Sequence, residues 1–74
     1  MLVKSQDKST VICLKNEKDL HIHMELRTNA IGVEVTCLMI GKVIMGSFYD
    51  LKNHEEAIDR LIQSLISDSD LHCI

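Results

Sequence analysis

The sequence predicts an α+β fold in which a four-stranded antiparallel β-meander is followed by one C-terminal amphipathic helix packed on one face of the sheet (ββββα). Residues 20–26 alternate strictly between apolar and polar side chains, which is the period of a half-buried strand. Between residues 58 and 66, apolar side chains recur at helical spacing instead. The 74 residues contain no Pro and only three Gly, so no linker is indicated and one small domain is expected over 1–74.

Four strands are expected at about 10–15, 20–27, 33–40 and 43–50. Polar runs at 16–19 and 28–32 supply the first two turns. Gly41-Lys42 supplies the third, because Gly at the first central position suits a two-residue type II′ turn. This loop places residues 40 and 43 opposite each other and so fixes the register of the second hairpin.

The helix is expected at about 54–67. Asn53 is the expected N-cap, with Glu56 three residues later in a capping-box arrangement. No Gly marks the end of the helix, so the tail at 68–74 either frays or docks on the sheet. The apolar stripe of the helix consists of Ile58, Leu61, Ile62, Leu65 and Ile66.

The predicted register gives the last two strands two different faces. We assign the face that carries Cys37, Gly46 and Phe48 to the helix, because Gly46 permits a close approach. The other face then has an uncovered apolar patch, which could be covered by the tail, serve as an interface, or result from a register slipped by one residue. The residues of this patch are Leu38, Ile40, Val43 and Met45.

A metal site is conceivable in the first hairpin. Pairing of the first two strands would put Cys13 opposite His21 and close to His23, with His72 or Cys73 as a fourth zinc ligand. A His-x-His pair in a strand is common, however, and no Cys-x-x-Cys accompanies it. The simpler interpretation is two solvent-facing histidines, so the prediction is no metal, with these three residues as weak candidates.

The motifs of enzymes are incomplete in this sequence. His54-Glu55-Glu56-Ala57-Ile58 begins like a zinc-protease motif but has Ile58 where the second histidine must stand. Gly41-Lys42 lacks the preceding glycine and the following Ser or Thr of a phosphate-binding loop. We therefore predict no catalytic residue, no cofactor and no enzyme.

Charge and composition narrow the classes of partner. Eight basic and eleven acidic side chains leave a net charge of −3, and only Phe48 and Tyr49 are aromatic, so nucleic-acid binding is not expected. The most apolar stretch, 37–45, is too short to cross a bilayer, and no secretion signal is recognisable. Three widely spaced cysteines suit reduced thiols, which predicts a cytoplasmic protein.

The leading hypothesis is a non-enzymatic protein–protein interaction module. It would self-associate as a homodimer, or bind a partner protein, through the patch at Leu38, Ile40, Val43 and Met45. One alternative is a metal-binding domain. The other is a small acidic inhibitor or accessory protein of bacterial or phage type, which would present its helix and tail to a basic surface. The acidic residues concerned are Glu55, Glu56, Asp59, Asp68 and Asp70.

Overall fold

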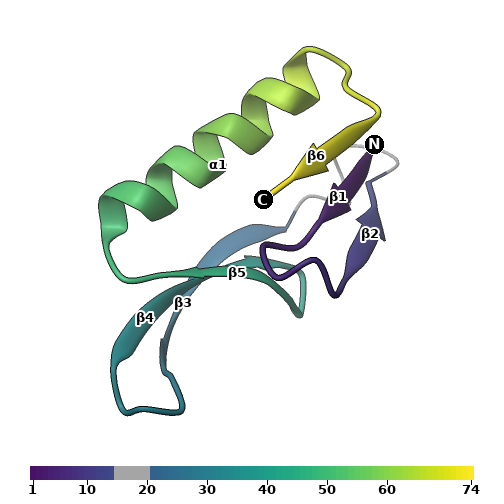
Figure 1. Cartoon of the computed structure of the whole chain (residues 1–74). Helices are drawn as coiled ribbons and strands as arrows, with labels where there is room; N and C mark the ends of the chain where they lie inside the picture. The colour runs from purple at the N-terminus through teal and green to yellow at the C-terminus, as the bar shows by residue number, and fades with distance from the viewer. Residues whose placement is uncertain (15–20) are drawn as a thin grey trace.

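The computed structural model describes residues 1–14 and 21–74, and over these residues the fold is α+β, with two three-stranded sheets and one helix (Figure 1). The predicted turn at 16–19 and the start of the predicted strand at 20–27 lie outside the described residues. The elements in chain order are β1 (Leu2–Lys4), β2 (Val11–Cys13), β3 (Ile22–Thr28), β4 (Glu34–Ile40), β5 (Val43–Phe48), α1 (Leu51–Ile66) and β6 (Leu71–Cys73).

The sheet β3-β4-β5, called the meander sheet below, confirms the antiparallel meander predicted for the middle of the chain. Gly41 adopts φ +61°, and Ile40 pairs with Val43 as predicted from the two-residue loop. Beyond Met39 the register shifts by one residue, so that Leu38 pairs with Gly46. The extra residue on β5 forms a β-bulge.

The sheet β2-β1-β6, called the terminal sheet below, corrects the prediction of one four-stranded sheet. The strand expected at 10–15 pairs with β1 and not with β3, and the tail forms β6, which runs parallel to β1. Each of these strands has only three residues, so none shows a period that sequence patterns detect. Figure 1 shows both chain ends in this sheet, beside the C-terminal half of α1.

The turn between β1 and β2 is built around Asp7. Asp7 Oδ1 accepts hydrogen bonds from Ser5 Oγ at 2.7 Å, Ser9 N at 3.0 Å and Ser9 Oγ at 2.7 Å. These bonds favour the ionised carboxylate and lower the pKa of Asp7 to about 2. Lys8 completes the turn with φ +65°. The local hydrogen bonds explain why β2 folds back on β1.

The helix begins three residues earlier than predicted, at Leu51. Asp50 is the N-cap, because its Oδ1 accepts from the Asn53 N–H at 2.8 Å and its Oδ2 accepts from Asn53 Nδ2 at 2.9 Å. The predicted cap at Asn53 is therefore wrong. At the other end Ser67 is the C-cap, and Asp68 takes the left-handed conformation (φ 57°) that glycine usually supplies.

The structure confirms part of the predicted face assignment and corrects the rest. Gly46 and Phe48 lie on the α1 side as predicted, but on β4 this side carries Leu38 and Ile40, whereas Val35, Cys37 and Met39 form a separate buried cluster on the outer face. The bulge is the physical reason, because one extra residue on β5 places Gly46 and Phe48 on the same face as Leu38 and not on that of Cys37. The main core joins α1 to both sheets through Val3, Leu14, Leu38, Ile40, Met45, Ala57 and Leu61.

Candidate functional site

The patch predicted as an interface is the core of the protein. Leu38, Met45 and Ile40 are 0%, 1% and 5% exposed, and half-buried Val43 packs against them. The tail contributes to their burial, because Ile74 joins this core and would lie 3.3 Å from a Cβ at Gly46. The prediction that this face is open is therefore wrong, and any interface must lie elsewhere.

The three weak metal candidates are not brought together in one hairpin. Cys13 lies on β2 opposite Leu2, whereas His23 lies on β3 in the other sheet, and His21 precedes β3. His23 Nδ1 contacts the His21 carbonyl oxygen at 3.2 Å. Within the ranges that the structure describes, no group of three His, Cys, Asp or Glu side chains could hold a metal ion.

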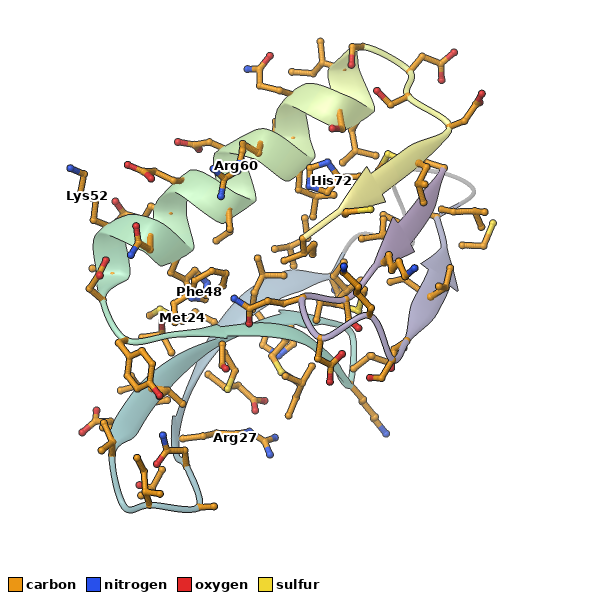
Figure 2. All side chains as sticks on the ribbon, in the orientation of Figure 1. Met24, Arg27, Phe48, Lys52, Arg60 and His72 are labelled. Atoms are coloured by element: carbon orange, nitrogen blue, oxygen red, sulfur yellow. The ribbon has the colours of Figure 1, made fainter. Side chains whose placement is uncertain are left out.

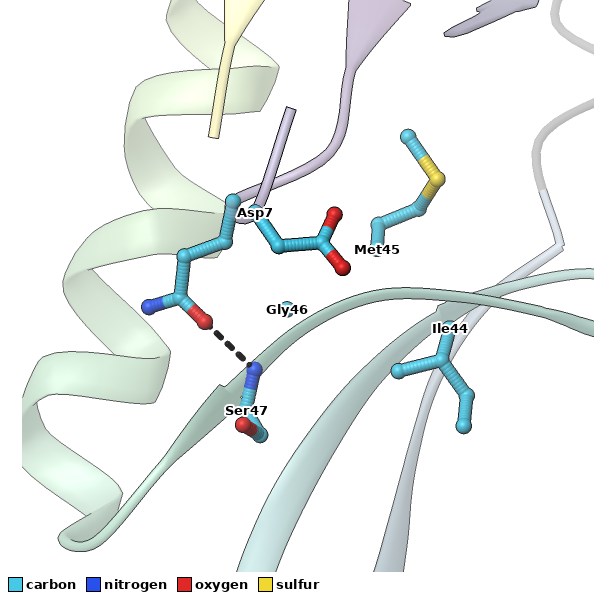
Figure 3. Close-up of a pocket in the computed structure, with 6 residues that line it drawn as sticks. Asp7, Ile44, Met45, Gly46 and Ser47 are labelled. Carbon is cyan, nitrogen blue, oxygen red and sulfur yellow. Dashed lines mark hydrogen bonds between the residues drawn. The ribbon is translucent and has the colours of Figure 1, made fainter. Parts of the chain in front are cut away.

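The outer edge of β5 is closed by the turn between β1 and β2. The Gln6 N–H donates to the Met45 carbonyl oxygen at 2.7 Å, and Gln6 Oε1 accepts from the Ser47 N–H at 2.9 Å. Figure 3 shows the second bond beside Asp7 and Gly46. The depression between turn and strand has a volume of about 100 Å³, which holds a few waters and is too small for a metabolite.

The outer edge of β3 is open, in that β4 is its only sheet neighbour among the described residues. The Gly41 N–H donates to the His21 carbonyl oxygen at 2.9 Å, and the Asn29 N–H donates to that of Val33 at 2.9 Å. Odd-numbered residues thus direct their backbone groups toward β4. Because the direction alternates along a strand, the backbone groups of four residues point away from the sheet. These are Ile22, Met24, Leu26 and Thr28.

The same residues of β3 direct their side chains to the α1 side of the sheet. Ile22 pairs with Ile40 and packs against the core, but Met24 and Leu26 are 46% and 64% exposed. They are exposed because α1 packs over β4 and β5. Figure 2 labels Met24 below the N-terminal part of α1.

The apolar stripe of α1 extends past the core on one flank. Ser64 lies on the flank that faces β6, because its Oγ contacts His72 Nδ1 at 2.6 Å. Ile58, Ile62 and Ile66 follow one another at four-residue spacing on the opposite flank, away from the terminal sheet. Ile62 and Ile66 are exposed.

The outward row of β3 is charged. Arg27 Nε and Nη2 donate to Glu25 Oε2 at 3.1 and 2.8 Å, and this bond lowers the pKa of Glu25 and raises that of Arg27. His23 Nε2 lies 3.5 Å from Glu25 Oε1. Figure 2 shows Arg27 extending along the face away from α1, the face on which Cys37 lies buried.

One polar contact holds α1 to the meander sheet from inside. His54 Nδ1 lies 2.9 Å from Thr36 Oγ1, and the Thr36 hydroxyl donates its proton to the Phe48 carbonyl oxygen at 3.3 Å. His54 then donates from Nδ1, and its buried Nε2 has no hydrogen-bond partner among the described residues. The ring also meets Phe48 edge-on at 5.3 Å. This histidine fastens the helix to the sheet.

The contact between Ser64 and His72 resembles a nucleophile and its base, but its surroundings differ. Burial and the nearby Arg60 guanidinium lower the pKa of His72. A catalytic base of this kind is oriented by a carboxylate, whereas the charged group that acts on His72 is a cation. The contact ties β6 to α1.

The terminal sheet carries a second apolar surface on its outer face. Val3 is fully buried, so the alternate residues Leu2 and Lys4 face outward together with their partners on β2 and β6. Those partners are Val11, Cys13, Leu71 and Cys73, all exposed. Because each strand has three residues, its edges offer few backbone groups to an added strand.

The acidic side chains named for a basic partner, Glu55, Glu56, Asp59, Asp68 and Asp70, are all exposed. Lys52 and Arg60, also exposed, interrupt their charge on α1. No helix in the described part of the chain has the length and apolar character needed to span a membrane.

The sequence predicts the strand β3 but not that its outer edge is open. Alternation at 20–26 indicates a strand with one apolar side, and the predicted meander order would pair that edge with the strand at 10–15. In the part of the chain that the structure describes, the edge is open because β2 pairs with β1 in the terminal sheet instead. Comparison of the chain with protein-family models, with curated proteins and with solved structures finds no match.

Proposed function

We propose that this chain is a non-enzymatic protein–protein interaction module that binds an extended protein segment as an additional strand on β3. The observation that carries the proposal is the contrast between a closed β5 edge and an unpaired β3 edge in the described residues. Unpaired N–H and C=O groups along a strand are a template for another strand.

The length of β3 supports this mode of binding. Its seven residues pair with β4 without a register shift, so every second residue along the whole strand directs its N–H and C=O groups to the outer edge. In natural sheets, β-bulges and inward-pointing charged side chains protect an edge strand against pairing with another chain, and β3 has no bulge. A partner strand would gain backbone hydrogen bonds at every second residue.

The side chains of the edge support it as well. Met24 and Leu26, both exposed, would pack against apolar side chains of the added strand. On the outer face, Glu25 and Arg27 offer both signs of charge to the partner. An added strand would therefore make apolar contacts on the α1 side of β3 and would have to match the charges on its outer face.

A photo-crosslinking amino acid placed at position 26 tests the proposal in the cells that make the protein. We expect an adduct with a protein at position 26 and none at position 52, an exposed site on the outer side of α1 (Figure 2). The mass of the adduct shows whether the partner is this chain or another protein. Absence of an adduct at 26, or equal adducts at both positions, would contradict the proposal.

A further inference from the structure

We propose that the strand added to β3 is β3 of a second copy, antiparallel about a twofold axis at Leu26. This inference rests on the function proposed above and names its partner. The dimer would contain one continuous six-stranded sheet with strand order β5-β4-β3-β3-β4-β5. Both helices would lie on the same face of that sheet, because each α1 packs on the face that carries Leu26.

Backbone geometry restricts the pairing. Two β3 strands related by a twofold axis must oppose their outward-facing residues, which are the even-numbered ones. Three registers keep five or more residues of Ile22–Thr28 paired, and they are centred on Met24, Glu25 or Leu26. All three allow the hydrogen bonds, so the side chains decide among them.

Charge complementarity distinguishes the three registers. An axis at Glu25 places this carboxylate opposite its own copy, and like charges directly opposite each other in a sheet destabilise the pairing. An axis at Met24 places Glu25 opposite His23 and leaves Arg27 outside the five paired residues, so this register forms no Glu–Arg pair.

The axis at Leu26 places opposite charges against each other. Glu25 lies opposite Arg27 of the second copy, and Arg27 opposite Glu25 of the second copy, so two ion pairs form across the axis. Each copy already joins Glu25 to Arg27 within its strand at 2.8 Å, and the four groups then alternate in sign. On the α1 side, the two Leu26 side chains meet and Met24 lies opposite Thr28.

Sedimentation equilibrium on four chains tests this register: the unmodified chain, Arg27→Glu, Glu25→Arg and the double exchange Glu25→Arg/Arg27→Glu. We expect a dimer of the unmodified chain, weakened roughly 100-fold by either single substitution, because each places two like-charge pairs across the axis. The double exchange restores opposite charges and returns the dissociation constant to within about threefold of the original.

Arg27 is exposed and Glu25 is half-exposed, so the variants are expected to keep the fold, and thermal melting at low concentration checks this. A dimer that is indifferent to Arg27→Glu, or that the double exchange fails to restore, overturns the register. A chain that stays monomeric at submillimolar concentration overturns the second copy as partner. In that case a crosslink from position 26 to another protein still supports the function proposed above. If no such crosslink forms either, both the proposed function and the proposed dimer are overturned.

Discussion

The two edges of the meander sheet differ in whether another part of the chain bonds their outward backbone groups. On β5, a bulge at Met45 breaks the ladder and Gln6 bonds both the carbonyl oxygen of Met45 and the N–H of Ser47. On β3, the ladder is regular and Leu26 stands exposed beside an unpaired backbone in the described residues. The β5 edge is therefore covered by another part of the chain, whereas the β3 edge, within the described part of the chain, keeps unpaired N–H and C=O groups that another strand could bond.

The closed edge depends on the terminal sheet. Gln6 stands in the turn between β1 and β2, and Ile74 follows β6, so both ends of the chain reach β5. The open edge depends only on contacts between neighbouring strands. Substitutions in the terminal sheet should therefore affect the β5 edge and the overall stability, while substitutions at the exposed residues of β3, such as Leu26, should affect association alone.

The largest expected effect comes from filling the space at Gly46. A Cβ there would lie 3.3 Å from Ile74 Cγ2 and 3.4 Å from Gln6 Cβ, so Gly46→Val must push both ends of the chain away from β5. We expect a loss of about 2–3 kcal/mol in the free energy of unfolding, measured by urea titration, and about 1 kcal/mol for Gly46→Ala. An unchanged midpoint for Gly46→Val would show that the β5 edge is not packed as described.

The open edge is tested by Leu26→Lys, which places a charge on the apolar side of β3. We expect association to weaken roughly 30-fold, or about 2 kcal/mol, because inward-pointing charge blocks edge pairing. Stability of the monomer should change by less than about 0.5 kcal/mol, since Leu26 is 64% exposed. Leu71→Lys, on the other apolar surface, is the matched control and should leave association unchanged.

The hydrogen bonds of the closed edge contribute less. Gln6→Ala removes the acceptor of the Ser47 N–H, and we expect a loss of about 1 kcal/mol in unfolding free energy together with faster exchange of the Ser47 amide. Gln6→Glu keeps an acceptor at the same place and should retain the slow exchange. Equal behaviour of the two variants would argue against this bond.

The smallest expected effect is the loss of stability at low pH, which occurs in two pH ranges. The lowered pKa of His72 means that its stabilising contribution is complete above its usual value near 6.5 and is lost as pH falls through the lowered pKa. The contribution of Asp7 is complete above 3.8 and is lost as pH falls toward 2. Melting curves should show both losses, the first absent in His72→Gln and the second absent in Asp7→Asn.

The meander sheet and the helix could be predicted because their signals are local. Alternation at 20–26, the Gly41-Lys42 turn and the helical spacing after residue 58 each depend on residues within a few positions of one another. The observed β3, β4, β5 and α1 lie close to the predicted ranges. The helix starts three residues earlier than predicted and the last strand of the meander ends at Phe48, because Asp50 caps the helix in place of Asn53.

The terminal sheet and the faces could not be predicted by the same means. β1 and β6 are three residues long and come from opposite ends of the chain, so their pairing leaves no pattern in either segment. Both sides of β4 are apolar, with Leu38 and Ile40 alternating with Cys37 and Met39, so alternation does not say which side meets the helix. The bulge at Met45 then places Gly46 and Phe48 on the face of Leu38, and the Gln6 N–H, which is remote in sequence, bonds the carbonyl oxygen of the bulged residue.

Amide hydrogen exchange at two strands tests the central claim most directly. In dilute monomer, we expect fast exchange at Met24, Leu26 and Thr28, whose N–H groups point outward, and slow exchange at Ser47, whose N–H is bonded to Gln6. Raising the protein concentration should slow the β3 amides selectively as the second copy adds its strand. Slow exchange at Leu26 in the monomer, or rates that do not change with concentration, would contradict the account.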